Sequence, residues 1–324
     1  MVAPTNDREY YITIQNAIRI IDVNSYNIRY YDSCYDDSNG SDNNENQPEN
    51  SKKNVAVVVL QERLIEEWLN VASILASKGI RIIVPEIIGF GYSDKPAMNY
   101  TIDFFLDFLM AFLDRLHITQ RTRTKSIIIL GYSLGGQLAA EFAIRLANKR
   151  SRIFEKLVLV APTGTMTNST HAMQKYIITL LYGNCWFLSP YYVDTSSISV
   201  LYQNYMIHDP NNVAIPEELI RNYSNVQGLP HTRLASVSTM LELGLGQKPE
   251  DGRLTAKLQG RLPQINCPTL LIWGYNDRIV PIENSKGFID EIPNCKMCVI
   301  QNCGHIPHLE KPIEFSKIIL DFLL

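Results

Sequence analysis

The chain has 324 residues, of which 46% are hydrophobic and 19% are charged, and its formal net charge at pH 7 is −3. This composition excludes a wholly disordered protein, and the small negative charge gives no electrostatic basis for binding nucleic acid. The length suits one large α/β core that carries an insertion. Because the first residues, MVAPTNDREYY, lack a basic-then-apolar signal segment, the six cysteines predict a reducing, cytoplasmic setting rather than a disulfide framework.

The amino-terminal part predicts a β-hairpin followed by a polar loop. Two β-branched and aromatic runs, YITIQNAIRIIDV (residues 11–23) and YNIRYYDS (residues 26–33), are separated near Asn24-Ser25. Residues 36–54, DDSNGSDNNENQPENSKKN, have essentially no apolar content, which predicts a disordered surface loop between strands.

From residue 55 onwards, predicted strands alternate with predicted helices. Each strand is a continuous apolar run, as expected when helices cover both faces of a sheet, so the sheet should be mostly parallel. The predicted strands are 55–60, 80–85, 126–130, 156–162, 269–274 and 296–300. The predicted helices are 65–78, 101–118, 134–148, 282–291 and a last helix from 312.

Residues 101–118, TIDFFLDFLMAFLDRLHI, come nearest to the composition of a membrane span. Their three aspartates, Asp103, Asp107 and Asp114, share one helical face opposite a stripe of Phe, Leu and Met. This pattern predicts an amphipathic helix lying on a core, and we expect no membrane span in the chain.

The interval 162–265 lacks strong strand signals and contains several predicted helices broken by prolines. The simplest account is an insertion into a sheet protein whose core comprises residues 1–161 and 266–324. Eight aromatic residues lie between positions 176 and 205 of this insertion. We expect most of them to pack the insertion onto the core and a few to line an apolar pocket.

The strongest functional signal is GYSLGG, in which residues 131–135 form a Gly-x-Ser-x-Gly motif between a buried strand and an alanine-rich helix. A sharp strand-to-helix turn strains the central residue and projects its side chain from the carboxyl edge of the sheet. Ser133 is therefore the predicted nucleophile, and the N–H of Leu134 is the predicted oxyanion donor. The alternative is a glycine-rich turn whose serine only caps the helix.

A serine nucleophile near neutral pH needs a base, and the base needs an acid that orients it. His305, in NCGHIPHLEKP, directly follows a predicted strand and is the candidate base. Asp277, in LLIWGYNDRIVP, lies in the turn after another predicted strand and is the candidate acid. His308 is assigned to helix surface or packing. The chain order Ser133, Asp277, His305 supports this assignment.

These motifs together resemble the α/β-hydrolase family, and the similarity runs from about residue 55 to the end of the chain. VPEIIGFGYSDKP resembles the loop after the family's fourth strand, GYSLGG its nucleophile elbow, WGYNDRIVP its acid turn and CGHIPHLEKP its histidine loop. The resemblance implies an α/β-hydrolase fold with a mostly parallel central sheet, and the triad Ser133, Asp277 and His305. It also implies that residues 162–265 form a helical cap.

Within the family, the segment MIHDPNNVAIPEELIRNY resembles the cap of hydrolases that cleave carbon–carbon bonds in ring-fission products of aromatic catabolism. Two departures weaken this narrower match. Those enzymes carry a cap arginine where the alignment gives Tyr223, with Arg221 two residues earlier, and they tend to have Trp where this chain has Ile306. The resemblance also implies structural roles for Ser93 and Asp94, whereas the elbow serine argues against dehalogenases and epoxide hydrolases, whose nucleophile is a carboxylate.

The loop that should supply the second oxyanion amide departs from the family pattern. Most members have His-Gly there, followed by further small residues, whereas residues 60–63 of this chain are Leu-Gln-Glu-Arg. Either an amide near Arg63 still points at Ser133, or the helix begins early and Leu134 is the single donor, at a cost on the order of 10²- to 10³-fold in rate. Glu62 would repel an oxyanion if it faced inwards, and Arg63 would help in the same place.

The sequence thus predicts a serine hydrolase that cleaves a carboxylic ester or related acyl bond of a small, largely apolar substrate through an acyl-enzyme on Ser133. Two alternatives stay open: a carbon–carbon bond hydrolase of a ring-fission dienoate, and a non-catalytic ligand-binding protein with an impaired oxyanion loop. The expected partner is a small acyl substrate, no cofactor or metal is implied, and a homodimer is left open.

Overall fold

The computed structural model of the chain shows a mixed sheet with helices on both faces. The structure describes residues 17–34, 55–118, 126–148, 155–165, 195–211, 213, 215–243 and 258–323. The loop predicted for residues 36–54 lies outside these ranges, as do residues 166–194 and 244–257 of the predicted insertion.

The sheet has eight strands in the order β1-β2-β4-β3-β5-β6-β7-β8. Their bounds are β1 Ile18–Val23, β2 Tyr26–Asp32, β3 Val55–Leu60, β4 Arg81–Pro85, β5 Ser126–Tyr132, β6 Lys156–Val160, β7 Thr269–Gly274 and β8 Cys295–Ile300. β2 pairs antiparallel with β1 and β4, and every other pair in the sheet is parallel. Because parallel strands end at one edge, the loops after β3, β5, β7 and β8 meet there.

The predicted helices are confirmed, two of them with a short 3₁₀ turn at the start. The helical elements are η2 Ile65–Trp68, α2 Leu69–Ser77, α3 Ile102–Arg115, α4 Leu134–Asn148, α6 Thr195–Leu201, η4 Tyr202–Met206, α7 Glu217–Gln227, α8 Thr232–Glu242, η5 Leu262–Gln264, η6 Ile282–Asn284, α9 Ser285–Glu291, α10 Pro307–Glu310 and α11 Pro312–Leu323.

The strands are apolar throughout because both faces of the sheet are buried. In β3, Val57 and Val59 contribute to a core that also contains side chains of α2 and α11. The alternate residues Ala56, Val58 and Leu60 contribute to a second core, which includes side chains of α3 and α4. The expected mostly parallel sheet with two covered faces is therefore confirmed.

The hairpin and the amphipathic helix also form as predicted. The turn between β1 and β2 consists of Asn24 and Ser25, both with positive φ (53° and 69°), as a two-residue type I′ hairpin requires. On α3, the exposed Asp103 and Asp107 bind Arg145, while the apolar side of the helix packs into the core. Among the helices that the structure describes, none combines the length and hydrophobicity needed to cross a bilayer.

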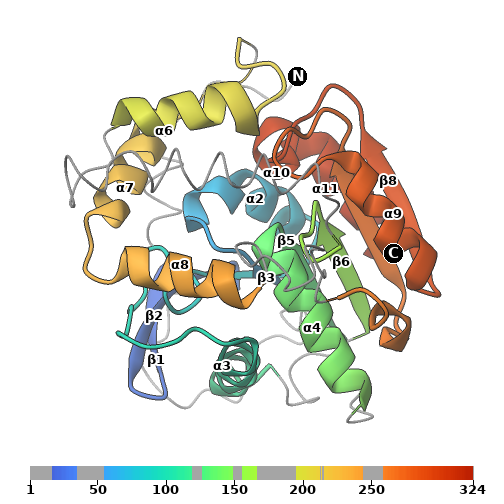
Figure 1. Ribbon diagram of the computed structural model, residues 1–324, viewed down its shortest axis with the longest axis horizontal. Helices are drawn as coiled ribbons and strands as arrows, with labels where there is room; N and C mark the ends of the chain where they lie inside the picture. Colours follow the sequence, from blue (N-terminus) through green and yellow to red (C-terminus); the bar gives the residue numbers. More distant parts are fainter. Residues whose placement is uncertain are drawn as a thin grey trace, which may run out of the picture.

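The elements α6, η4, α7 and α8 lie between β6 and β7 in the sequence. Figure 1 shows α6, α7 and α8 gathered on one side of the molecule, at the left of the view. The end of η4 packs against the loop after β8, because the N–H of His305 donates to the carbonyl of Met206 over 2.8 Å. This part of the insertion therefore lies directly against the edge of the sheet where the candidate site residues are found.

Candidate active site

Ser133 occupies the sharp turn between β5 and α4. Its φ is 53°, a left-handed conformation that costs a residue with a side chain on the order of 1 kcal/mol or more. Its N–H donates to the carbonyl of Val160 over 3.0 Å, which helps to hold the turn. The residue is only 6% exposed. The serine hydroxyl is thus presented at the carboxyl edge of the sheet in a strained, well-supported position.

Glycine on both sides of Ser133 lets the backbone segments approach closely. A Cβ on Gly135 would lie 2.1 Å from the carbonyl oxygen of Leu60, and a Cβ on Gly131 would lie 2.5 Å from the Cβ of Ala139. These contacts leave no room for a side chain. As a result, the first turn of α4 lies against the end of β3, where the candidate oxyanion loop begins.

The three residues predicted as a triad come together around the imidazole of His305. Its Nε2 lies 3.1 Å from Oγ of Ser133, and its Nδ1 lies 2.7 Å from Oδ2 of Asp277. The other oxygen of Asp277, Oδ1, accepts the N–H groups of Ile279 and Val280 over 2.8 and 2.9 Å. His305 is 2% exposed. The arrangement can move a proton from the hydroxyl to an imidazole whose positive charge the carboxylate stabilises.

The histidine loop is fixed by Glu310, a residue that the sequence did not single out. One carboxylate oxygen accepts the N–H of Gly304, and the other accepts the N–H of His208 over 2.5 Å. A Cβ on Gly304 would lie 2.4 Å from the carbonyl oxygen of Met206. Glu310 therefore joins the loop that carries His305 to the segment that follows η4.

The loop after β3 keeps an irregular path without glycine. Residues 61–64 are non-helical, η2 begins only at Ile65, and none of residues 61–64 has a positive φ. The alternative in which the helix begins early is therefore wrong, and the loop keeps its path without any residue in the left-handed conformation. A different hydrogen-bond pattern replaces the glycine conformation.

Gln61 stabilises this path through both ends of its amide. Its Oε1 accepts the N–H of Arg63 over 2.6 Å, and its Nε2 donates to the carbonyl of Pro85 over 3.3 Å. The side chain is fully buried. Because the N–H of Arg63 is bonded within the loop, the structure does not bring it to Ser133 as the sequence predicts.

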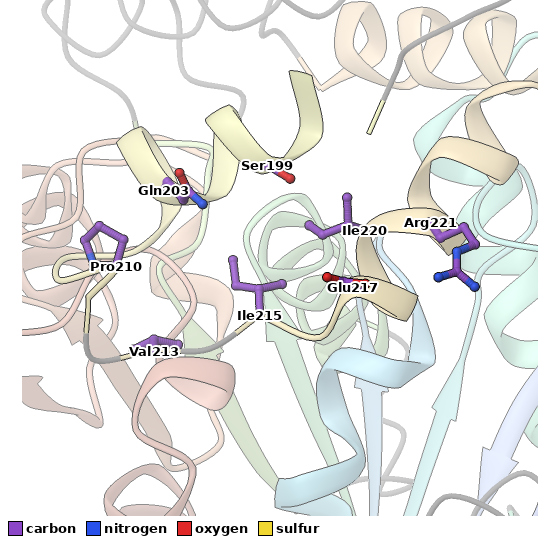
Figure 2. Close-up of a pocket in the computed structure, with 8 residues that line it drawn as sticks. All are labelled: Ser199, Gln203, Pro210, Val213, Ile215, Glu217, Ile220 and Arg221. Atoms are coloured by element: carbon purple, nitrogen blue, oxygen red, sulfur yellow. The ribbon is translucent and has the colours of Figure 1, made fainter. Parts of the chain in front are cut away.

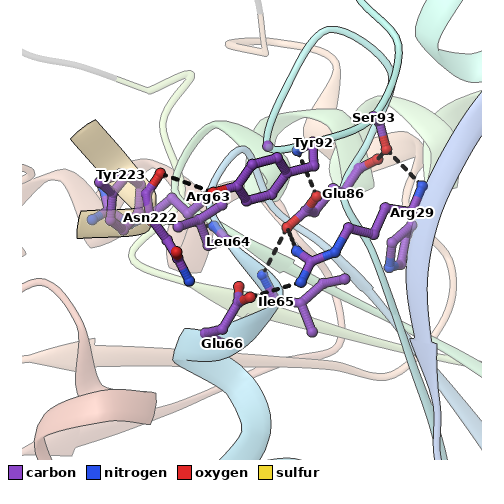
Figure 3. Close-up of polar contacts among 12 residues, drawn as sticks. Arg29, Arg63, Leu64, Ile65, Glu66, Glu86, Tyr92, Ser93, Asn222 and Tyr223 are labelled. Carbon is purple, nitrogen blue, oxygen red and sulfur yellow. Dashed lines mark hydrogen bonds and ion pairs between the residues drawn. The ribbon is translucent and has the colours of Figure 1, made fainter. Parts of the chain in front are cut away.

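The next two N–H groups are also bonded to side chains. Leu64 donates to the hydroxyl of Tyr223 on α7 over 3.1 Å. Ile65 donates to Oε1 of Glu86 over 3.3 Å (Figure 3). The side chains of Gln61, Tyr223 and Glu86 thus hold the loop, and the N–H groups of residues 63–65 are not free to bind an oxyanion.

The Arg63 side chain points away from the place that the sequence predicts for it. Its Nε lies 2.9 Å from both carboxylate oxygens of the buried Glu67, and its Nη2 donates to the hydroxyl of Tyr202 over 2.6 Å. Burial raises the pKa of Glu67, but the charge of Arg63 and the contact with His308 outweigh it and hold this pKa well below the usual range. Arg63 therefore joins the loop to η4 instead of facing Ser133.

A second buried carboxylate, Glu86, anchors the start of η2. The guanidinium of Arg29 lies between Glu86 and Glu66, with nitrogen–oxygen distances of 2.5 and 2.7 Å (Figure 3). The hydroxyl of Ser93 donates to the carbonyl of Glu86 and accepts the N–H of Arg29. Burial is the main cause that raises the pKa of Glu86 to about 7; Arg29 opposes this shift and Glu66 adds to it.

Glu62 faces inwards, towards the nucleophile turn. Its Oε2 lies 3.4 Å from the N–H of Gly135, in the first turn of α4, and its carboxyl interacts electrostatically with His305. The neighbouring residue, Leu134, begins α4, and its N–H donates to no group in the described part of the chain. The inward carboxyl and the free amide therefore both border the region beside Ser133.

Arg221 lines a cavity formed by the insertion. The cavity has a volume of about 590 Å³, and Figure 2 shows its lining on α6, η4, α7 and the segment before α7. Its described lining residues are Ser199, Gln203, Pro210, Val213, Ile215, Glu217, Ile220 and Arg221. Ser133, Asp277 and His305 are not among these lining residues.

Comparison with known proteins gives matches over most of the chain. The family model described as "alpha/beta hydrolase fold" matches residues 64–312. A 2-hydroxymuconate semialdehyde hydrolase of Pseudomonas sp. (strain CF600) is 26% identical over 263 residues, which are 80% of this chain and 82% of the relative. A monoacylglycerol lipase of Xenopus laevis is 23% identical over 266 residues, 79% of this chain and 71% of the relative.

A solved structure confirms the same architecture. The 2-hydroxy-6-oxo-6-phenylhexa-2,4-dienoate hydrolase from Rhodococcus sp. strain RHA1 has a TM-score of 0.70 and 17% identity, with 94% of this chain and 99% of the other covered. At this identity the likeness speaks for the fold alone. Together with the family match, it shows that this chain belongs to the α/β-hydrolase family and is a hydrolase.

Proposed function

We propose that the protein is a serine hydrolase that cleaves a carboxylic ester, or a related acyl bond, of a small and largely apolar substrate. The observation that carries the proposal is the hydrogen-bonded series from Asp277 through His305 to Ser133. In it, Ser133 is the nucleophile, His305 the general base and Asp277 the residue that orients the imidazole.

In the proposed mechanism, Oγ of Ser133 attacks the substrate carbonyl while Nε2 of His305 takes the hydroxyl proton. The N–H of Leu134 stabilises the resulting oxyanion. His305 then returns the proton to the leaving alcohol, and an acyl-enzyme is left on Ser133. A water molecule activated by His305 hydrolyses this ester by the same steps.

An ester substrate is favoured by the charges around the site. A substrate carboxylate would need a cation, but the guanidinium of Arg63 is bonded to Glu67, and Arg221 lines the cavity of the insertion, whose described lining contains none of the triad residues. The lipase among the relatives acts on an ester by its name, which adds support.

A second candidate is a carbon–carbon bond hydrolase acting on a dienoate. Several relatives carry the names of such enzymes, the Pseudomonas protein among them. The two candidates are separated by assaying wild type and Arg221→Ala with a ring-fission dienoate. Turnover that depends on Arg221 would favour the second candidate.

The division of the chain is part of the proposal. Residues 162–265 form a cap over a core of residues 1–161 and 266–324, and the contact between Gly304 and Met206 supports this arrangement. A cytoplasmic location is supported by the cysteines, because none of the five described ones forms a disulfide bond.

The decisive experiment is labelling with a fluorophosphonate, which reacts with an activated serine. We expect wild type to be labelled at Ser133 and to show a burst with a p-nitrophenyl ester, and Ser133→Ala to show neither. Absence of labelling in folded wild-type protein would contradict the proposal and favour a binding role.

A further inference from the structure

The three consecutive N–H groups of residues 63–65, in the loop after β3, are not free to act as the second oxyanion donor of the proposed mechanism. The N–H groups of residues 63–65 all donate to side-chain oxygens. In the family pattern this loop provides the second amide. A side chain can therefore take the place of the missing amide opposite the N–H of Leu134.

The carboxyl of Glu62 is the side-chain group that borders this place. Its Oε2 lies 3.4 Å from the N–H of Gly135, one residue beyond Leu134, and the group faces His305. Arg63, the adjacent cation, is directed to Glu67 and forms no hydrogen bond to Glu62. Glu62 is thus a carboxyl beside the nucleophile without a cation bonded to it in the described part of the chain.

We propose that Glu62 in its neutral, protonated form donates the second hydrogen bond to the oxyanion and is a catalytic residue of this hydrolase. The proposal rests on the acyl-transfer function proposed above. A neutral carboxyl can donate through its hydroxyl, whereas an ionised one can only accept. The same side chain that would repel an oxyanion when charged stabilises it when protonated.

The surroundings of Glu62 favour the neutral form. Burial raises the pKa of the carboxyl, and the charge of Arg63 together with the nearby imidazole of His305 and backbone N–H groups offsets this only in part. The phenol of Tyr132, from β5, also faces the group, and its own pKa is raised, so it stays neutral. A carboxylic acid kept neutral by an apolar site can serve as an oxyanion donor.

The proton balance of the step is simple. Oγ of Ser133 forms a bond to the carbonyl carbon, its proton passes to Nε2 of His305, and the electron pair of the carbonyl π bond moves to oxygen. Glu62 keeps its proton throughout and shares it with the oxyanion in a hydrogen bond. When the tetrahedral intermediate collapses, the electron pair returns and the leaving alcohol takes the proton from His305.

The test compares Glu62→Gln and Glu62→Ala with wild type, using a short-chain p-nitrophenyl ester across a pH range in which each protein stays folded. Gln retains a donor of similar length but cannot ionise, whereas Ala has no donor. We expect Glu62→Ala to lower kcat on the order of 10²- to 10³-fold and Glu62→Gln to stay within about tenfold of wild type. Wild-type activity should decline on the alkaline side, and the Glu62→Gln activity should level off there instead.

Each other outcome overturns the inference. Glu62→Ala as active as wild type, or more active, would mean that the carboxyl is a bystander or an obstruction. A loss in Glu62→Gln equal to that in Glu62→Ala, or an unchanged alkaline decline in Glu62→Gln, would also contradict it. Fluorophosphonate labelling of wild type at Ser133 keeps the two proposals apart: labelling with a failed Glu62 test leaves the hydrolase function standing.

Discussion

The Nε of Arg63 lies 2.9 Å from both carboxylate oxygens of Glu67, and Glu67 is completely buried. Removing one partner of a buried pair leaves an uncompensated charge. We expect Arg63→Met to lower the free energy of unfolding by about 3–5 kcal/mol, measured by urea denaturation. The double variant Arg63→Met with Glu67→Met should regain much of this loss.

The exposed pair formed by Lys286 and Asp290 on α9 is the matched control. Because both side chains are largely in solvent, Lys286→Met should change the free energy of unfolding by less than about 1 kcal/mol. An equal loss in Lys286→Met and Arg63→Met would show that burial does not decide the contribution of these ion pairs.

Glu86 should make stability fall as pH rises. Its pKa of about 7 in the folded chain exceeds the unfolded value of about 4.3, so its contribution is complete below the unfolded value and is lost as pH rises through about 7. We expect wild type to lose on the order of 2–3 kcal/mol relative to Glu86→Gln between about pH 4.5 and pH 8. Denaturation of both proteins across this range measures the difference, and a constant difference would contradict the prediction.

Gln61 should be important for the loop after β3. Gln61→Ala leaves the N–H of Arg63 and the carbonyl of Pro85 without their buried partner, which should cost about 1–3 kcal/mol in the free energy of unfolding. Asn70→Ala, on the exposed side of α2, should change it by no more than about 0.5 kcal/mol. Chemical denaturation of the two variants provides the comparison, and similar values would argue against the loop role of Gln61.

Gly135 should tolerate no side chain. A Cβ there would lie 2.1 Å from the carbonyl oxygen of Leu60, so Gly135→Ala must move α4 away from β3 and displace the Leu134 N–H. We expect lower thermal stability and loss of most ester hydrolysis. Gly228→Ala is the control, because its Cβ would meet only the Asn225 carbonyl at 3.4 Å and both properties should stay near wild type. Normal activity in Gly135→Ala would contradict the close approach.

Asp277→Asn should test whether Asp277 orients the imidazole of His305 for catalysis. An amide cannot accept from Nδ1 of His305 while also accepting the N–H groups of Ile279 and Val280 as the carboxylate does. By comparison with other serine triads, we expect kcat for an ester to fall by about 10³- to 10⁴-fold with little change in KM. A variant that retains wild-type kcat would exclude Asp277 as the orienting acid.

The strands, the helices and the convergence of Ser133, Asp277 and His305 were predictable because each feature depends on local pattern and strand order. Continuous apolar runs indicate a buried parallel sheet, and residues that follow such strands meet at one edge. The path of residues 61–65 was not predictable in this way. It depends on Tyr223 and Glu86, which are far away in the sequence and approach only in the folded chain.

The directions in which the side chains of this loop point could not be predicted from the sequence either. Glu62 and Arg63 are adjacent, yet one faces Gly135 and the other faces Glu67. A shift of the turn by one residue would exchange the directions of these two side chains. An irregular loop has no periodicity from which the directions could be inferred. Glu310 belongs to the histidine motif NCGHIPHLEKP, but its role in joining the histidine loop to the insertion depends on the approach of His208, which only the fold shows.

The carboxylate of Glu310 couples the position of the His305 imidazole to the position of the insertion. One carboxylate oxygen accepts the N–H of Gly304 and the other accepts the N–H of His208. A bulky substrate that displaces the segment after η4 would therefore also displace Gly304, the residue before His305. Oversized molecules would then be rejected by disengagement of the base, even where they fit beside the serine. Discrimination by size would appear in the turnover rate before it appears in affinity.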